Sequence, residues 1–401
     1  MSDYLLAHPR MIPLGGGEAA TAWMLQALLE RGTVTLLTGP GYQLEAMDRA
    51  YGTRLSGQRN LSILCSTPPL LRFLGHFGVT LNHLQLRLFV RELRKEGWNH
   101  GVCVCAYGIL DLGHELPTVW YLHGPPENSR EAIYKRNVEN RSNPLMRLLA
   151  RLNLLLSNLL VPWRKGMSES SFAIANSHWT SRAFQELYKK PADAVLYPPP
   201  IGEETQLPRN TKRSFIAIGR AHRDKGLEEA VSIVSGLRER GHQVELTLFV
   251  VPFEPETLHR LKELDLRYPW LQLRIEASRE EIDREIAAHC FGLHASRFEA
   301  YGMAVAELLL GDCLTAVRDL GGQVEIVTET QLRFTTPEEA VEKLHAVLSS
   351  RQLEQRLRES QAARKERYTK QQFLSGFHKC LDRFEAVSPR NDESAGEKLI
   401  R

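Results

Sequence analysis

The sequence lacks any apolar run near the roughly 20 residues that a membrane-spanning helix requires. Residues 1–3 carry no basic segment of the kind that begins a secretory signal, so we expect no targeting peptide. The six cysteines are not spaced as zinc ligands, and Cys103 and Cys105 alternate with apolar residues. This pattern favours reduced, buried thiols in a cytoplasmic protein. The net charge of +3 is too small to indicate a nucleic-acid partner.

What is present is a regular alternation of short apolar strands and helical patterns. It predicts an α/β protein with mostly parallel, doubly wound sheets. At 401 residues the chain is long enough for two domains with separate cores. The polar, proline-containing segment 201–211 is the best linker, so we predict an N-terminal domain over 1–205 and a C-terminal domain over 206–370. An amphipathic helix over 371–386 and a polar tail over 387–401 follow.

The stretch 294–325 reads as the end of a strand, a tight turn at Gly302 and a helix from Met303 to Leu310. The free amide groups at such a helix start form a ready anion site. A phosphate there would leave Glu307 within reach of a neighbouring ribose, because one carboxylate can accept from two vicinal hydroxyls. Glu299 would point at the group attached to the far phosphate. The alternative is two glutamates on an ordinary surface helix.

A second basic turn follows the apolar strand 214–218. Arg220 can grip two oxygens at once and Lys225 adds a compact point charge, which together suit a diphosphate. Two cations would also neutralise a leaving nucleotide, so we expect no metal ion. The alternative is a solvated basic loop.

The first turn of the chain is rich in glycine and supports two interpretations. Gly15, Gly17 and Ala20 fit the G-x-G-x-x-A fingerprint of dinucleotide-binding proteins, which predicts a nicotinamide oxidoreductase. That interpretation needs an acid at the end of the strand 33–38 to hold the ribose, and none is there. A tight turn needed only for packing also remains open.

Taken together, Ser296 to Gly302, Glu307 and the segment 319–325 resemble the donor-site signature of family 4 retaining glycosyltransferases. The resemblance implies the GT-B fold, an α/β architecture of two Rossmann-like doubly wound domains facing a central cleft. It implies that Arg220 and Lys225 bind the donor phosphates, since that family carries an Arg and a Lys with the same gap.

The same resemblance assigns roles to backbone groups and to one histidine. The loop containing Gly15 and Gly16 would face the donor pyrophosphate, with the Gly16 amide approaching it. His123 follows an apolar strand and would contact the donor sugar; the alternative is a structural histidine. The turn from Ala300 to Met303, which includes Tyr301, would offer amides to the sugar hydroxyls and the diphosphate.

The implied function is a metal-independent, retaining transfer of a hexose from a UDP-, GDP- or ADP-sugar to a hydroxyl acceptor, with no further cofactor. The acceptor would be a glycan, a glycolipid or a lipid-linked saccharide. Ala300 and Ala304 depart from the family pattern, where glycine and proline are common. An inactive relative that serves as a scaffold or partner subunit is therefore the alternative.

The segment 133–166 is least like the family and mixes basic residues with leucines. One interpretation is a basic amphipathic helix on an anionic membrane surface, which would place the protein at the cytoplasmic face of a membrane. The other is a helix that covers the N-terminal sheet and exposes its arginines to water.

Overall fold

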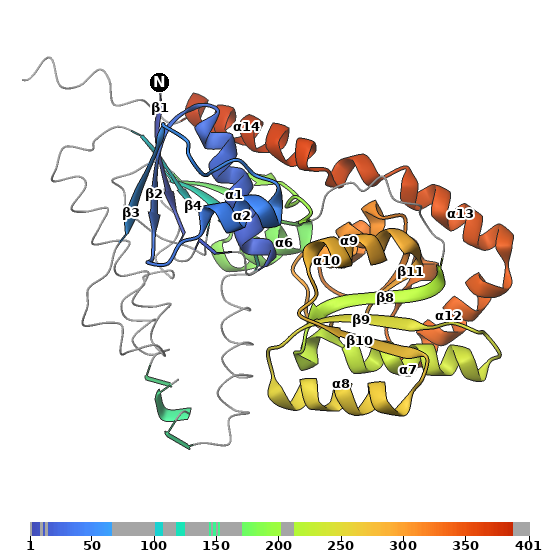
Figure 1. Cartoon of the computed structure of the whole chain (residues 1–401). Coiled ribbons are helices and arrows are strands. Elements are labelled where there is room, and N and C mark those ends of the chain that lie inside the picture. The colour runs from blue at the N-terminus through green and yellow to red at the C-terminus, as the bar shows by residue number, and fades with distance from the viewer. Residues whose placement is uncertain are drawn as a thin grey trace, which may run out of the picture. The chain divides into compact units, whose positions relative to one another are not determined.

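The computed structural model of the chain describes residues 2–8, 11–12, 15–65, 101–106, 118–124, 144–145, 147–149, 151–152, 171–201 and 212–387. The chain divides into two compact units, of which unit 1 comprises Met1–Leu196 with Phe373–Arg401 and unit 2 comprises Tyr197–Gln372. The division thus falls before Tyr197, a little earlier than the boundary at 205 predicted from the sequence. Figure 1 shows that each unit is a sheet with helices packed on it.

Unit 1 contains a parallel sheet with the strand order β3-β2-β1-β4-β5-β6-β7. The order reverses direction between β1 and β4, so the sheet is doubly wound, as the sequence predicted. The central strands β1, β4, β5 and β6 are largely buried on both faces, which explains their continuous apolar character, whereas the edge strands β3 and β7 are only partly buried. Their bounds are β1 Ser2–Ala7, β2 Gly32–Thr38, β3 Leu61–Cys65, β4 Val102–Cys105, β5 Thr118–Leu122, β6 Ser171–Ala175 and β7 Ala194–Val195.

The described helices of unit 1 are α1 Gly16–Leu29, α2 Leu44–Tyr51, α6 His178–Tyr188 and α14 Lys370–Val387, the last joining unit 1 from Phe373. Ser177 caps α6 by accepting a hydrogen bond of 3.0 Å from the amide of Thr180. From the sequence we expected 39–60 to be a loop on the acceptor side of the N-terminal domain; this expectation is wrong, because the segment contains the helix α2. Met47 and Tyr51 bury one side of α2, and Gly52 ends it in the left-handed conformation.

The last helix, α14, packs on the first sheet. Its buried residues Phe373, Phe377, Leu381 and Phe384 follow a spacing of three to four residues. At its far end Arg31 lies 2.7 Å from Asp382 and 3.1 Å from Glu385. The C-terminal segment therefore completes the core of unit 1, although most of that core comes from the first half of the chain.

Unit 2 contains a second parallel sheet with the strand order β10-β9-β8-β11-β12-β13. Its order reverses between β8 and β11, so this sheet is doubly wound too. Phe215 of β8 stacks on Phe291 of β11 at 5.1 Å between ring centroids in the middle of the core. The bounds are β8 Lys212–Arg220, β9 Leu246–Val251, β10 Leu271–Ile275, β11 His289–His294, β12 Leu314–Arg318 and β13 Arg333–Phe334.

The helices of unit 2 connect these strands and cover both faces of the sheet (Figure 1). They are α7 Leu227–Glu239, α8 Pro255–Arg267, α9 Arg279–Ala288, α10 Met303–Leu310, α11 Gln323–Ile326, α12 Pro337–Ser349 and α13 Arg351–Ala362, with short 3₁₀ turns at Arg223–Lys225, Thr330–Leu332 and Lys365–Tyr368. The bounds of α10 are those that the sequence predicted.

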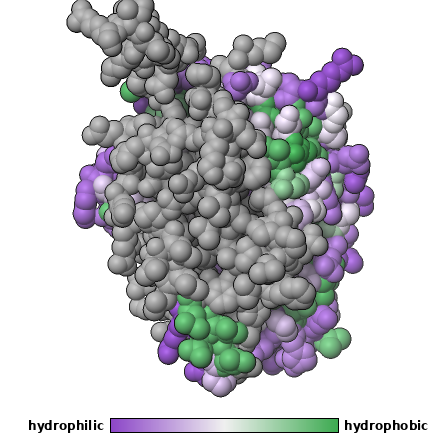
Figure 2. Space-filling view, turned by 90° about the vertical axis from the view of Figure 1, so that its left-hand side faces the viewer, coloured by the Kyte–Doolittle hydropathy of each residue, from purple (hydrophilic) through white to green (hydrophobic). Residues whose placement is uncertain are grey.

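Several predicted segments fall wholly or mostly outside the described residues. They are 202–211 of the linker, 388–401 of the tail, and most of 133–166. Of the last, only short helical turns within 144–152 are described, and there Leu145, Leu148 and Leu152 are exposed. Figure 2 shows hydrophobic side chains gathered at the lower end of the face that it draws.

The structure can be compared with two sequence observations, the lack of a long apolar run and the pattern of the cysteines. Within the part of the chain that the structure describes, no helix is both long and apolar enough to cross a bilayer. All six cysteines are free, and five are buried. The prediction of buried thiols is wrong for Cys65, which ends the edge strand β3 and is exposed.

Candidate functional site

The candidate site of unit 2 lies at the carboxyl ends of the parallel strands β8 and β11. Arg220 is the last residue of β8, and His294 is the last residue of β11. The turn after each strand carries one of the charged residues singled out in the sequence, Lys225 and Glu299. Ligands of doubly wound sheets gather at this edge because loops from neighbouring strands meet there.

Lys225 and Glu299 form a direct ion pair. The Lys225 ammonium lies 2.6 Å from Oε2 of Glu299, and Nε2 of His294 lies 3.3 Å from the same oxygen. Burial by itself raises the pKa of Glu299, but the charge of Lys225 and the hydrogen bond from His294 outweigh it. The pKa of this carboxyl therefore lies well below its usual range, and Glu299 is ionised at neutral pH.

The turn carrying Glu299 is held by its neighbours through backbone contacts. The Arg297 amide donates to the carbonyl of Asp224 at 2.7 Å, and the Gly322 amide donates to the carbonyl of Glu299 at 2.9 Å. Gly321 has a φ of 78°, and a Cβ added there would lie 2.2 Å from the Glu299 carbonyl oxygen. Only glycine fits this close approach, which explains the Gly-Gly pair in the sequence.

Arg220 is exposed at the end of β8, and its guanidinium lies over the ring of Phe253 at 4.9 Å. No described carboxylate forms an ion pair with it. Arg220 therefore differs from Lys225, whose charge is already balanced by Glu299.

The start of α10 offers backbone amides. Gly302 precedes the helix with a φ of 108°, no side chain caps it, and no acidic residue occupies its first turn. Tyr301 is buried and stacks on Tyr197 at 5.5 Å between ring centroids. The helix start is thus fixed in place with amide groups of Met303 and the next residues uncapped by side chains.

Glu307 is buried one turn further along α10, with 6% of its surface exposed. Its Oε2 accepts from Nη1 of Arg279 at 2.9 Å, and its Oε1 accepts from the amide of Ile201 at 3.3 Å. Burial by itself lowers the pKa of Arg279, but the charges and hydrogen bonds of Glu307 and Asp283 outweigh burial. The pKa is raised overall, so the guanidinium stays charged. The predicted ribose ligand therefore already has a cationic partner.

Arg279 was not singled out as a site residue from the sequence. It is the first residue of α9, after the cap Ser278, whose side chain accepts from the amide of Glu281. The cap and the Arg279–Asp283 pair, which are four residues apart, are both readable from the sequence. The pairing with Glu307 is not, because 28 residues separate the two.

In unit 1 the glycine turn and His123 come together. Gly15 precedes α1, and Gly16 is its first residue, so the Gly16 amide is among those at the helix start. A Cβ added to Gly17 would lie 3.9 Å from Cε1 of His123, so the ring packs against the glycine. The sequence considered Gly17 only for the dinucleotide fingerprint.

His123 is further held by two hydrogen bonds. Its Nε2 lies 2.8 Å from the carbonyl oxygen of Ala106, and its own carbonyl accepts from the side chain of Asn176 at 2.9 Å. Burial lowers the pKa of His123 to about 4, and the hydrogen bond to Ala106 offsets only part of that effect. The imidazole is therefore neutral at pH 7, with a fixed orientation.

The dinucleotide interpretation was also open from the sequence. Strand β2 ends at the buried Thr38, so the acid that a dinucleotide site requires is not at its end. Among the described residues, no three His, Cys, Asp or Glu side chains form a group suited to a metal ion.

No family model matches the chain. The chain is 26% identical over 228 residues to the GDP-Man:Man(3)GlcNAc(2)-PP-Dol alpha-1,2-mannosyltransferase of Candida glabrata. The match covers 52% of this chain and 44% of the relative. The chain thus spans less than half the length of this curated relative.

Comparison of the structure gives similarity along almost the whole chain. WaaG, a glycosyltransferase involved in lipopolysaccharide biosynthesis, superimposes with a TM-score of 0.65 at 14% identity, covering 95% of this chain and 99% of WaaG. HepE of Anabaena, solved in complex with UDP and glucose, has a TM-score of 0.65 at 15% identity, covering 95% of this chain and 100% of HepE. The two parallel-sheet α/β domains of this chain therefore have the GT-B fold of these glycosyltransferases, as predicted from the sequence.

Proposed function

We propose that this protein is a retaining, metal-independent glycosyltransferase of the family 4 type that transfers a hexose from a nucleoside diphosphate sugar to a hydroxyl acceptor. The observation that carries the proposal is the Lys225–Glu299 pair beside the uncapped start of α10, at the carboxyl edge of a doubly wound sheet. The GT-B fold supports it, and the solved complex of HepE with UDP and glucose shows that the fold accommodates such ligands.

The donor diphosphate would bind to Arg220, Lys225 and the amides from Ala300 to Met303. A guanidinium binds phosphate oxygens in pairs, while an ammonium and helix-start amides add charge and hydrogen bonds without a metal. When a donor phosphate replaces Glu299 as the partner of Lys225, the ionised Glu299 would turn to the sugar hydroxyls. The pair in the ligand-free protein keeps both side chains oriented for this exchange.

Glu307 would bind the ribose, and Arg279 would position it. The ion pair at 2.9 Å fixes one carboxylate oxygen, whereas the contact of the other oxygen with the Ile201 amide, at 3.3 Å, is long. The ribose hydroxyls would replace this weaker partner. In unit 1, the Gly15–Gly16 turn would bind the diphosphate, and the neutral His123 would contact the sugar.

The proposed reaction forms a bond between the acceptor oxygen and the anomeric carbon on the face from which the nucleoside diphosphate leaves. The bond from the anomeric carbon to the phosphate oxygen breaks, and the acceptor proton passes to that departing phosphate. No protein nucleophile is required, and the anomeric configuration is retained. Charge on the departing diphosphate would be stabilised by Arg220 and Lys225.

The names of two similar proteins support a proposal for the acceptor class. The curated relative is named for a mannosyl transfer from GDP-Man to a dolichol-linked saccharide, and WaaG is described as acting in lipopolysaccharide biosynthesis. We therefore propose a glycan, glycolipid or lipid-linked acceptor, reached from the cytoplasm. Contact of 133–166 with the membrane face belongs to the same proposal.

The test is a thermal-shift and calorimetric screen with UDP-, GDP- and ADP-sugars. A donor at about 100 times its dissociation constant should stabilise the protein by about 2.7 kcal/mol. Arg220→Gln with Lys225→Gln should remove this shift, whereas Lys262→Gln on the exposed face of α8 should keep it. NMR of the product should show the donor's anomeric configuration. No binding of any of the three donor classes would contradict the proposal.

A second candidate is a non-catalytic relative that serves as a partner subunit. The observation that favours it is Glu307, both of whose oxygens accept hydrogen bonds from the protein itself. Donor binding without release of nucleotide in the presence of acceptor would support this candidate over the enzyme.

A further inference from the structure

A polar cavity lies in unit 2 away from the candidate donor site. It has a volume of about 490 Å³ and is lined by Arg213, Leu348, Arg351, Glu354, Gln355 and Arg358. Arg213 is near the start of β8 and Arg220 is at its end. A strand rises by about 3.3 Å per residue, so Arg213 lies about 23 Å from Arg220. The cavity is therefore at the opposite end of the strands from the donor residues.

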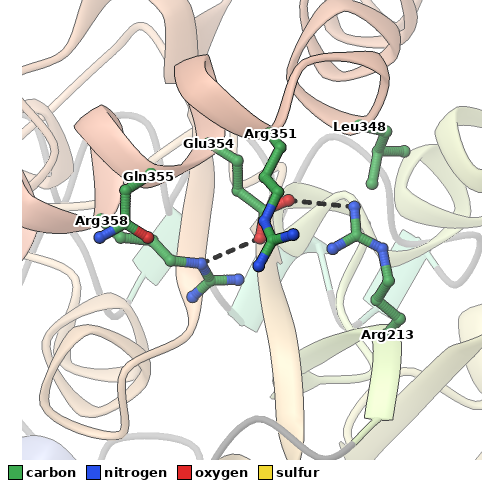
Figure 3. A pocket seen from close by; sticks show the side chains of 6 residues that line it. All are labelled: Arg213, Leu348, Arg351, Glu354, Gln355 and Arg358. Atoms are coloured by element: carbon green, nitrogen blue, oxygen red, sulfur yellow. Dashed lines mark hydrogen bonds and ion pairs between the residues drawn. The ribbon is translucent and has the colours of Figure 1, made fainter.

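Most of the lining comes from one face of α13. Arg351, Glu354, Gln355 and Arg358 are spaced by three and four residues, so their side chains project from the same side of the helix. Figure 3 shows the guanidinium groups of the three arginines turned toward the same space as the Glu354 carboxylate. Leu348 is the one apolar side chain in the lining, so the cavity does not suit an apolar ligand.

Two of the arginines form a rigid frame. Glu354 lies 3.0 Å from Arg213 through one oxygen and 3.0 Å from Arg358 through the other. Both guanidiniums also lie 5.4 Å from the centroid of the Phe291 ring. Arg358 uses its remaining groups to donate to the carbonyls of Asp312 and Cys290, at 3.0 and 2.9 Å. Like charges are thus held close together before any ligand binds.

The cavity carries a net positive charge. Three arginines and one glutamate line the cavity, so two positive charges are not balanced within it. Arg351 has no hydrogen bond or ion pair with another described residue. Arg213 bonds Glu354 through Nη2, and its side chain is 56% exposed. Guanidinium donors of both residues therefore remain available to a ligand in the cavity.

From this geometry we infer that the cavity is a binding site for a phosphate group, separate from the donor site. A phosphate oxygen pair matches the fork of a guanidinium, and Arg213 and Arg351 approach from a strand and a helix, so one phosphate can bridge them. The group could belong to a soluble phosphate compound or to an anionic lipid headgroup, since both present the same oxygens.

The experiment for a soluble ligand is calorimetric titration with sodium pyrophosphate. The full chain would carry Arg220→Gln and Lys225→Gln, so that the proposed donor site does not contribute. Adding Arg351→Gln should weaken binding about tenfold, the effect of losing one charge-assisted hydrogen bond. The matched control is Arg356→Gln, which removes the same charge from an exposed position of the same helix and should change affinity less than about twofold.

The experiment for a lipid source is sedimentation with vesicles of phosphatidylcholine containing phosphatidic acid, beside vesicles of phosphatidylcholine alone. If the site binds a headgroup, Arg351→Gln should reduce sedimentation with the anionic vesicles and Arg356→Gln should not. Hydrogen exchange gives a second readout, because pyrophosphate should protect amides near the start of α13. The inference is overturned if Arg351→Gln changes neither pyrophosphate affinity nor sedimentation more than Arg356→Gln does.

Discussion

The ammonium of Lys225 lies 2.6 Å from Oε2 of Glu299, although 74 residues separate them in the sequence. Lys225 ends a 3₁₀ turn after β8, and Glu299 lies in the turn after β11. The adjacency of these two strands in the sheet brings the turns together. The pair lowers the pKa of Glu299 and keeps this carboxylate ionised. Its coupling energy can be measured.

The first prediction concerns the strength of this pair. Both side chains are largely buried, with exposures of 21% and 16%, so removal of one partner should leave the other poorly compensated. A double-mutant cycle of Lys225→Ala and Glu299→Ala, read from chemical unfolding, should give a coupling energy above about 1 kcal/mol.

The matched control is the Arg260–Glu228 pair of the same unit, whose side chains are 41% and 40% exposed. Its cycle should give less than about 1 kcal/mol, because solvent screens exposed pairs. Equal coupling in the two cycles would show that burial does not strengthen the Lys225–Glu299 contact.

The second prediction concerns pH and His123. Its pKa falls from 6.5 to about 4 on folding, so the unfolded chain binds more protons between these values. The contribution of His123 to stability is therefore present above pH 6.5 and is lost as the pH falls toward 4. The slope from this one group cannot exceed about 1.4 kcal/mol per pH unit.

His123→Gln removes the titrating group and keeps a donor for the Ala106 carbonyl. The variant should have a flatter stability profile between pH 6.5 and 4, measured by the pH dependence of the melting temperature. An NMR titration that finds His123 protonated at pH 6 would refute the prediction.

The sequence predicted local features of unit 2 well. The bounds of α10 followed from Gly302 and from the apolar positions after it. Both signals act within a few residues, so periodicity and turn chemistry can detect them.

Features that depend on tertiary contacts could not be predicted in the same way. The partners of Glu307 are Arg279 and the Ile201 amide, which come from another helix and from the linker region. Nor could the sequence show that Gly321 supports the Glu299 turn, because that contact depends on how β11 and β12 are aligned. Helix α2 was missed for a different reason: its local signals, two buried residues and Gly52, were present but were assigned to a loop.

The third prediction follows from the burial of Glu307. Glu307→Ala leaves Arg279 with Asp283 as its remaining carboxylate, so the variant should lose about 1–3 kcal/mol of stability without any ligand. Glu342→Ala, at a side chain that is 71% exposed, should cost less than about 0.5 kcal/mol. Chemical unfolding of the unliganded variants measures both.

The fourth prediction separates backbone conformation from crowding at the glycine that supports the candidate site. Gly321 and Gly241 both have positive φ, 78° and 90°, but a Cβ would lie 2.2 Å from the Glu299 carbonyl oxygen at Gly321 and would meet nothing within 4 Å at Gly241. Each alanine variant should lose about 1 kcal/mol from the backbone conformation alone. Gly321→Ala should cost more, because the Glu299 turn must move, and it should also weaken binding of the donor nucleotide. Unfolding and calorimetric titration of the two variants measure these effects, and equal losses in both would mean that the Glu299 turn does not depend on the glycine.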